Sequence, residues 1–269
     1  MRIDEDKVFV RQSWLKDMML CPQRALLAER APEFNKLTND SAAVGTAVHA
    51  GIESALSGQA LSFAHDVALA KLDALVDEGV RTTNLDPSRL RSNVAGLFAA
   101  WVNDIMPEVE AEGASEYSFA VPTGVKVGDY ELWFEGTMDY ATKACLWDWK
   151  TSSRKYSPLE KQSQDIQASV YWFAATQLGL TDPQAPFKFG VMVRTEKPYG
   201  QIVSVRRTTA HANFVIDQAA TAVSYALTMA SHDKWLKNDQ HHLCSERWCP
   251  WWSVCKGAHI SEPDNALEA

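Results

Sequence analysis

The sequence lacks the features that would place the protein in several special classes. No apolar run reaches the roughly 18 residues of a membrane-spanning helix, and the polar start MRIDEDK contains no signal-peptide core. No repeat, low-complexity block or Gly/Ser-rich linker divides the 269 residues. These absences predict a soluble cytoplasmic protein with no membrane association, whose residues 1–269 form one domain.

Positive charge is also scarce. The chain has 26 Lys and Arg against 34 Asp and Glu, a formal net charge of −8. A protein that coats nucleic acid gains affinity by neutralising phosphates with basic side chains, so this balance argues against a general coat. It does not exclude an enzyme acting on nucleic acid, because carboxylates that hold divalent cations add to the negative count.

Hydrophobic periodicity divides the chain into three parts. Residues 1–112 are mainly helical and include an insertion at about 62–108, residues 113–207 carry the strand patterns, and residues 208–269 form a long helix with a Cys-rich tail. The expected helices are 13–29 with a break at Pro22, 41–57, 62–108 with an interruption near Asp86-Pro87, 157–178 and 208–237. The expected strands are 115–121 and 129–140, with a turn near 122–124 between them, then 144–149, 187–194 and 201–207.

Two carboxylates and an amine are predicted to meet in the middle part. Asp148 and Lys150 lie two apart on a predicted strand and share a side, whereas Trp149 faces the other. Asp139 ends the neighbouring predicted strand. Such oxygen ligands suit Mg²⁺ or Mn²⁺, which polarise a phosphate and acidify water. Lys150 would then orient that water or stabilise charge on the phosphorane.

The alternative interpretation of Asp148 and Lys150 is an ion pair on a solvent-facing strand, which contributes little. The surrounding run CLWDWK is mostly apolar, and buried charges need partners or a metal. This environment favours a functional site.

Three other side chains are weaker candidates for the same site. His49 lies on a predicted helix whose small residues, beginning at Gly45, permit close approach to a sheet, so it is a candidate metal ligand. The alternative is a packed or capping histidine. Gln167 and Tyr171 are four apart on one helix face and could contact a substrate strand or orient water, although such pairs are usually core or surface residues.

Four of the five cysteines are grouped in a way that predicts a metal clasp. Cys21 lies near the start, and Cys244, Cys249 and Cys255 lie near the end, whereas Cys145 lies in a strand pattern and is expected to pack. Four thiolates suit a [4Fe–4S] cluster or a structural zinc, and the alternative is buried, inert cysteines. By analogy with disulfides, closing so long a loop contributes about 5 kcal/mol.

The ordered series of these motifs resembles the PD-(D/E)XK nuclease superfamily, specifically its RecB-like branch. That branch includes AddB-type nuclease domains and the CRISPR-associated iron–sulfur exonucleases. The resemblance covers nearly the whole chain. It is carried by Ser13 with Cys21-Pro22, Gly45 to His49, Glu135-Gly-Thr-Met-Asp139, Asp148-Trp-Lys150-Thr151, Gln167-x-x-x-Tyr171 and the terminal cysteines.

The resemblance implies a restriction-endonuclease-like α/β fold, with a central mixed sheet flanked by helices, a helical N-terminal part and a Cys-rich tail closing onto it. Roles follow for the matching positions. His49, Asp139, Asp148 and the Trp149 carbonyl would hold Mg²⁺ or Mn²⁺, Lys150 would be the catalytic lysine, Gln167 and Tyr171 the helix motif, and Cys21, Cys244, Cys249 and Cys255 the [4Fe–4S] ligands, with zinc as the alternative. Two departures are Met138, where the superfamily name has Pro, and the Cys-x4-Cys-x5-Cys spacing.

The sequence therefore predicts a metal-dependent DNA nuclease. The expected form is an exonuclease preferring single-stranded DNA or free ends, in recombination, repair or phage DNA metabolism. A helicase or recombinase partner and the oligomeric state stay open. The alternative is a catalytically decayed single-stranded-DNA-binding or adaptor module that keeps the cysteine clasp, against which the intact Asp139, Asp148 and Lys150 argue.

Overall fold

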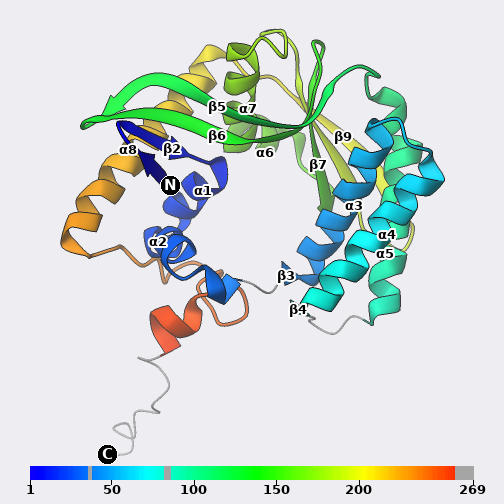
Figure 1. Ribbon diagram of the computed structural model, residues 1–269, viewed down its shortest axis with the longest axis horizontal. Helices are drawn as coiled ribbons and strands as arrows, with labels where there is room; N and C mark the ends of the chain where they lie inside the picture. Colours follow the sequence, from blue (N-terminus) through cyan, green and yellow to red (C-terminus); the bar gives the residue numbers. More distant parts are fainter. Residues whose placement is uncertain (36–37, 82–85, 258–269) are drawn as a thin grey trace, which may run out of the picture.

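The protein is built on a seven-stranded mixed sheet flanked by helices, as the computed structural model shows for residues 1–35, 38–81 and 86–257 (Figure 1). The strand order is β1-β2-β6-β7-β8-β9, and β5 pairs with β6 outside this path. A parallel pair of very short strands, β3 and β4, lies apart from it. This architecture confirms the expected α/β fold class.

The bounds of the elements follow the expected pattern in outline. The strands are β1 (Arg2–Asp4), β2 (Lys7–Val10), β3 (Thr38–Asn39), β4 (Val80–Arg81), β5 (Ala114–Val127), β6 (Tyr130–Ala141), β7 (Leu146–Ser152), β8 (Phe187–Val193) and β9 (Tyr199–Val205). The helices are α1 (Gln12–Leu20), α2 (Pro22–Arg30), α3 (Asp40–Leu56), α4 (Leu61–Glu78), α5 (Pro87–Asp104), α6 (Pro158–Gln164), α7 (Ile166–Gln177) and α8 (Thr209–His232), with short turns η1 (Pro32–Asn35), η2 (Met106–Glu108) and η3 (Ser253–Gly257). None of the helices in these described ranges is long and apolar enough to span a membrane.

Strand β6 has three neighbours, and their arrangement leaves a notch in the sheet. β5 runs antiparallel beside β6 from residue 130 to 141 and occupies one edge. On the other edge, β2 pairs in parallel with residues 131–134, and β7 pairs with residues 140–141. No described strand pairs with residues 135–139 on that edge, so their backbone groups lie at a gap in the strand pairing between β2 and β7.

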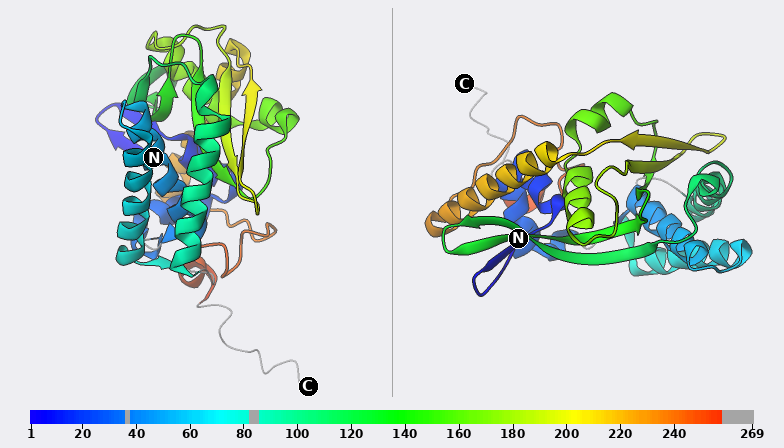
Figure 2. Two further views of the ribbon diagram at one scale, coloured as in Figure 1. Left: turned by 90° about the vertical axis from the view of Figure 1, so that its right-hand side faces the viewer. Right: turned by 90° about the horizontal axis from the view of Figure 1, so that it is seen from above.

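Helices cover both faces of the sheet and form two cores. Side chains of α1, α7 and α8 pack with those of β2, β6 and β8 in one core. Side chains of α3, α4 and α5 pack around Trp147 and Trp149 of β7 in the other. The alternation of a strand thus puts Asp148 on the α7 side and its two tryptophan neighbours on the α3 side. Figures 1 and 2 show α3 to α5 at one end of the long strands β5 and β6, and α1, α2 and α8 at the other.

Two expectations about local structure were wrong. The single helix expected at 157–178 is two helices, because Asp165 has extended backbone and caps α7 by accepting a hydrogen bond from Ala168 N–H at 2.9 Å. The turn expected near 122–124 lies instead at Gly128, which has a positive φ of 59°. Residues 122–126 form a bulge inside β5.

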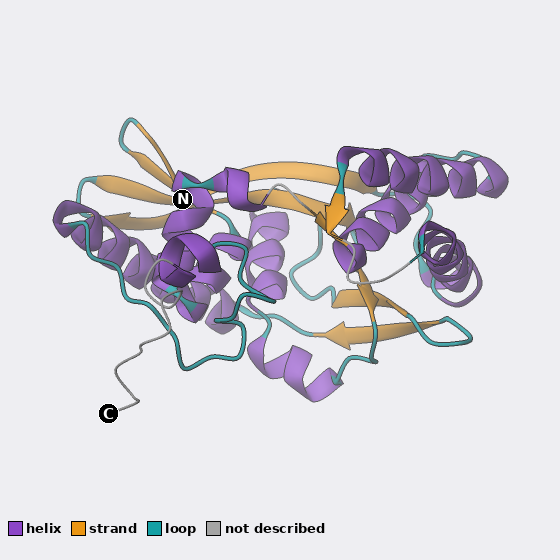
Figure 3. Ribbon diagram, turned by 90° about the horizontal axis from the view of Figure 1, so that it is seen from below, coloured by secondary structure: helices purple, strands orange, loops and turns teal. Residues whose placement is uncertain are grey.

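The two ends of the chain meet. The segment after α8 returns past α1 and α2, as the secondary-structure colouring in Figure 3 makes visible. The backbone N–H of Gln23 donates to the carbonyl of Leu236 at 3.1 Å. The indole N–H of buried Trp251 donates to the carbonyl of Ala31 at 2.8 Å. These contacts confirm a Cys-rich tail that closes onto the helical N-terminal part.

Candidate active site and cysteine pocket

Asp139 lies at the end of the notch in the sheet, where β6 and β7 begin to pair. The last paired residues are Tyr140 and Trp147. One step further, the Asp139 carboxylate accepts a hydrogen bond from the backbone N–H of Trp149 at 2.6 Å. A side-chain hydrogen bond therefore takes over where the backbone pairing of β6 with β7 ends, and this bond holds the Asp139 carboxylate in place.

Helix α3 delivers His49 to the same point because it approaches β7 closely. A Cβ atom at Gly45 would lie 3.2 Å from the hydroxyl oxygen of Thr151. The His49 Nε2 lies 2.8 Å from the Trp149 carbonyl, which can only accept, so Nε2 carries the proton of this hydrogen bond. Nδ1 lies 3.8 Å from Asp139 Oδ2 and is the ring atom left available to a cation.

Asp148 and Lys150 form a buried ion pair beside this group. The Asp148 side chain is fully buried, and its Oδ2 lies 2.5 Å from Lys150 Nζ. Its Oδ1 accepts a hydrogen bond from the amide of Gln167, on α7, at 2.6 Å. Burial raises the pKa of Asp148 to about 6, an effect that Lys150 offsets in part and Asp139 increases. Burial would lower the pKa of Lys150, but Asp148 and Asp139 outweigh it and the pKa is raised, so the amine stays charged.

Tyr171 lies one turn after Gln167 on α7, as the four-residue spacing predicts. Its ring is buried and meets that of Phe119 edge-on, with centroids 5.6 Å apart. Burial, together with the charges of Asp148 and Asp139, raises the pKa of Tyr171 to about 12. Tyr171 is therefore a neutral phenol near the two carboxylates.

The structure adds Glu116, which sequence reasoning missed. Its neighbours pair in the order Ser115 with Tyr140 and Tyr117 with Met138, so Glu116 lies opposite Asp139. Its φ is +47°, a left-handed conformation unusual for glutamate. Glu116 is an exposed residue whose carboxyl group is partly desolvated, and this desolvation, followed by repulsion from Asp139, raises its pKa. The only signal available in the sequence was the strand register, which the bulge at 122–126 conceals.

His49, Glu116 and Asp139 together could hold a cation. Each offers one ligand atom, and these atoms all lie within 4.8 Å of one another. Two carboxylates and one imidazole fit Mn²⁺ or Mg²⁺ by chemistry, since oxygen donors dominate. Asp148 is not part of this group, because its oxygens face Lys150 and Gln167. The structure thus brings the predicted residues together in two adjoining sets, one offering ligands and one holding a buried ion pair.

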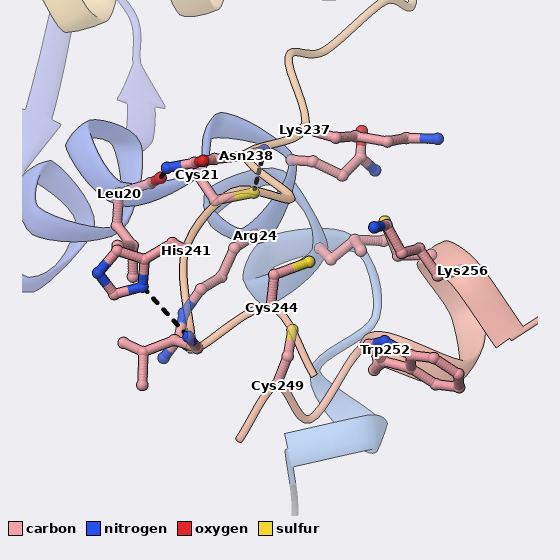
Figure 4. A pocket seen from close by; sticks show the side chains of 14 residues that line it. Leu20, Cys21, Arg24, Lys237, Asn238, His241, Cys244, Cys249, Trp252 and Lys256 are labelled. Carbon is pink, nitrogen blue, oxygen red and sulfur yellow. Dashed lines mark hydrogen bonds between the residues drawn. The ribbon is translucent and has the colours of Figure 1, made fainter. Parts of the chain in front are cut away.

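The four terminal cysteines line one pocket, as predicted. Cys21 lies between α1 and α2, and Cys244, Cys249 and Cys255 come from the returning tail. Figure 4 shows the sulfurs of Cys21, Cys244 and Cys249 directed toward a common space. Burial raises the pKa of the Cys249 thiol, and the neighbouring Cys244 and Cys21 add to this. Cys145 is apart from them, fully buried in the approach to β7, where burial raises its pKa to about 12.

The cysteine pocket has the chemistry of a metal site but not the spacing of a preformed zinc site. All four thiols are free, and among the described residues no three cysteines have sulfurs mutually within 4.8 Å. Tetrahedral zinc with Zn–S bonds near 2.3 Å would place the sulfurs about 3.8 Å apart. Backbone N–H of Asn238 donates to Cys21 Sγ at 3.5 Å, the kind of contact that also surrounds bound clusters.

Comparisons with known proteins address the family and the fold. A sequence model of the PD-(D/E)XK nuclease superfamily matches residues 12–256, which include every site residue described above. No curated protein gives a significant match. The crystal structure of a candidate exonuclease from Eubacterium rectale superposes with a TM-score of 0.58 at 14% identity, covering 91% of this chain and 92% of that one. The crystal structure of SSO0001 superposes with a TM-score of only 0.37 at 11% identity, covering 84% of this chain and 78% of that one.

At 14% identity, the first likeness concerns the fold alone. The family match is of another kind, because it extends over most of the chain and rests on sequence. The chain therefore belongs to the PD-(D/E)XK nuclease superfamily.

Proposed function

We propose that this protein is a divalent-cation-dependent DNA nuclease that hydrolyses phosphodiester bonds with Mg²⁺ or Mn²⁺. The observation that supports the proposal is the adjacency of two sets of residues. His49, Glu116 and Asp139 gather potential ligand atoms within 4.8 Å, and the buried pair of Asp148 and Lys150 lies next to them. A bound cation would polarise the phosphate and acidify water there.

The roles of the protein's own groups follow from their contacts. Nε2 of His49 donates to the Trp149 carbonyl, which fixes the ring and directs Nδ1 toward Asp139. Gln167 holds one oxygen of Asp148, and Lys150 holds the other. The Lys150 ammonium is the positive group of the buried pair, in position to stabilise negative charge that develops on the phosphate.

A cation held nearby would lower the pKa of Asp148. Its pKa of about 6 reflects burial and the repulsion of Asp139. A divalent cation held by Asp139 would offset that repulsion, because its charge would favour the ionised form of both carboxylates. We propose that Asp148 would be a further ligand if its carboxylate turned from Lys150 and Gln167 toward the cation, which would leave Lys150 free to meet the substrate.

The preferred substrate in this proposal is single-stranded DNA or a strand with a free end. Support comes from the resemblance to the RecB-like branch and from the Eubacterium rectale structure, whose protein is named as a candidate exonuclease. Recombination, repair or phage DNA metabolism is the setting that the resemblance suggests.

We further propose that Cys21, Cys244, Cys249 and Cys255 bind a [4Fe–4S] cluster. Support comes from the four thiols that line one pocket and from the resemblance to the iron–sulfur members of the RecB-like branch. The pocket joins α2 to the tail, so the cluster would act first as a staple between the ends of the chain.

A cleavage assay tests the nuclease proposal. End-labelled single- and double-stranded DNA are incubated with Mn²⁺, with and without EDTA. Wild type should cut the single strand, EDTA should stop it, and Lys150→Met should lower the rate by roughly 10²–10³-fold. Lys126→Met, on the exposed β5 bulge, is the matched control.

The same assay addresses the decayed binding module. DNA binding by wild type with no cleavage at any Mn²⁺ concentration would establish that alternative and refute the nuclease proposal. Cleavage that persists in EDTA would contradict the metal dependence.

A further inference from the structure

A second hollow of about 330 Å³ lies beside the proposed active site, between the first turns of α7 and α8. Asp165, Ser169, Arg207, His211 and Phe214 are among its lining residues. The two sites share the start of α7. Ser169 lines the hollow, whereas Gln167, two residues earlier and about 200° around the helix, donates to Asp148 from the opposite face of α7. With its side chains an α-helix is about 10–12 Å across, so a strand of a few nucleotides that passes the first turn of α7 would contact both places.

The wall of the hollow contains a buried guanidinium. Arg207 is 4% exposed, its Nη atoms donate only to backbone carbonyls, and its Nε is buried without a hydrogen-bond partner. Within the described part of the chain, no carboxylate lies within ion-pair distance of Arg207. The nearby Asp165 carboxylate is already held by Lys161 at 2.7 Å and by Ala168 N–H at 2.9 Å. Four backbone carbonyls and the charge of Asp165 stabilise the guanidinium in place, and the buried Nε is the donor that remains for an anion.

The first turn of α8 adds a second attraction for anions. This helix has 24 residues, no acidic residue in its first turn and no side-chain cap on its N–H groups. Thr208, the N-cap residue, contacts His211 Nδ1 at 2.9 Å instead. Uncapped N–H groups at the positive end of a long helix bind phosphate readily.

An aromatic ring lies one turn further along the same helix. Phe214 lines the hollow, and 64% of it is exposed, although it is one of the largest apolar side chains. Nucleobases stack on exposed aromatic rings irrespective of sequence. The hollow thus combines a buried guanidinium, an uncapped helix end and an exposed aromatic ring. The first two suit a phosphate and the third suits a base, which are two parts of a nucleotide unit.

We propose that this hollow binds one nucleotide unit of the single-stranded DNA substrate, with its phosphate at Arg207 and the start of α8 and its base on Phe214. The inference rests on the proposed function, because the strand held here is the one presented to Asp139, Asp148 and Lys150.

Two variants test the hollow without disturbing the core. Phe214→Ala removes an exposed ring. Ala210→Glu puts a carboxylate in the hollow at an exposed position of the first helical turn, where a negative charge is favourable for the helix. Thr221→Glu, exposed further along α8, is the matched control for added charge. Circular dichroism melting verifies that all three variants fold.

Binding is measured by the anisotropy of a labelled oligothymidine in EDTA, over a range of salt concentrations. Phe214→Ala should weaken binding by roughly tenfold. Ala210→Glu should weaken it and reduce the slope of log affinity against log salt by about 0.7, the value for one lost phosphate contact on a single strand. Thr221→Glu should bind like wild type. Equal affinity of wild type, Phe214→Ala and Ala210→Glu would overturn the inference.

Competition and cleavage measurements distinguish a strand from a free nucleotide and the subsite from the nuclease centre. If unlabelled dTMP binds and Phe214→Ala weakens that binding while oligothymidine affinity is unchanged, the hollow takes free nucleotides and the strand proposal is wrong. Cleavage is measured on the same variants. If wild-type protein binds through Phe214 but never cuts DNA, the nuclease function is refuted and the subsite stands. If wild-type protein cuts DNA and both variants bind it with unchanged affinity, the subsite alone is refuted.

Discussion

The carboxylate of Asp139 accepts the backbone N–H of Trp149 at 2.6 Å, one step beyond the last β6–β7 pair. The carbonyl of the same Trp149 accepts from His49. The backbone N–H and carbonyl of Trp149 on β7 therefore fix the positions of two candidate ligands, the carboxylate of Asp139 and the imidazole of His49. His49 and Glu116 line a hollow between α3, α4 and β5, which gives this end of the ligand group access to solvent.

Asp139→Asn is expected to separate the structural role of this side chain from its charge. The amide oxygen still accepts the Trp149 N–H, so the melting temperature should change little. Loss of the negative charge should weaken Mn²⁺ binding by at least about tenfold, as measured by calorimetry. Asp129→Asn, at the exposed β5–β6 turn, is the control and should bind Mn²⁺ normally. Unchanged Mn²⁺ affinity in Asp139→Asn would remove this residue from the ligand set.

Glu116→Gln tests the ligand that only the structure identifies. The glutamine keeps the shape and the left-handed backbone of the site but lacks the charge. Because Glu116, His49 and Asp139 offer atoms within 4.8 Å of one another, Mn²⁺ affinity should fall, and more Mn²⁺ should be needed for half-maximal cleavage. Glu78→Gln, exposed at the end of α4, should behave like wild type. A Glu116→Gln protein with wild-type Mn²⁺ affinity would show that this carboxylate is only a neighbour.

The pKa of Asp148 predicts opposite pH effects on folding and on cation binding. Burial raises this pKa from 3.8 to about 6. The folded protein then holds its proton more tightly than the unfolded chain, so the metal-free protein should lose stability as pH rises from about 4 to 6. Cation binding favours the ionised carboxylate, so Mn²⁺ affinity should rise over the same interval.

Carboxyl carbon NMR on the metal-free protein measures this titration directly. Mg²⁺ should move the Asp148 midpoint to lower pH, because the cation competes with the proton. In Asp148→Asn, the change in stability between pH 4 and 6 should shrink. A carboxyl group that titrates near its ordinary value without metal would contradict the burial argument.

The fold could be predicted from the sequence where the hydrophobic periodicity agrees with the residues that end or begin helices. Pro22 separates α1 from α2, and Asp86-Pro87 begins α5, as expected from proline at a first helical turn. The Asp139 and Asp148 strands are neighbours, as their short connection suggested. Strands β1 and β2 were missed, since strands this short carry too few residues to show a period.

The part of the site that escaped prediction depends on register. The pairing of β5 with β6 shifts within residues 122–126, so no count outward from the turn places Glu116 opposite Asp139. The break at Asp165 was likewise hidden, because the apolar period continues across it while the backbone does not. Periodicity reports which face is buried, whereas bulges and caps decide where along the element a side chain falls.

Loss of one of the four clasp cysteines should destabilise the fold, because these cysteines bring the N-terminal helices and the C-terminal tail together. Cys249→Ser should lower the iron and sulfide content of anaerobically purified protein and lower its melting temperature, because the pocket joins α2 to the tail. Cys145→Ala removes a thiol that lies outside the pocket and should leave the iron content unchanged. Zinc in place of iron in wild-type protein would replace the cluster assignment. Full metal content in Cys249→Ser would exclude this cysteine as a ligand.

The close approach of α3 to β7 predicts a coupled effect at Gly45 and Thr151. A Cβ at position 45 would lie 3.2 Å from the Thr151 hydroxyl, so Gly45→Ala should push α3 outward and lengthen the His49–Trp149 contact. Cleavage should fall several-fold, while stability changes less, since alanine is favoured over glycine by about 1 kcal/mol within a helix. Thr151→Ala removes the obstructing hydroxyl, so the double variant should regain both cleavage rate and Mn²⁺ affinity relative to Gly45→Ala. A double-mutant cycle with no coupling in Mn²⁺ affinity would mean that His49 reaches its place without the close contact of these two elements.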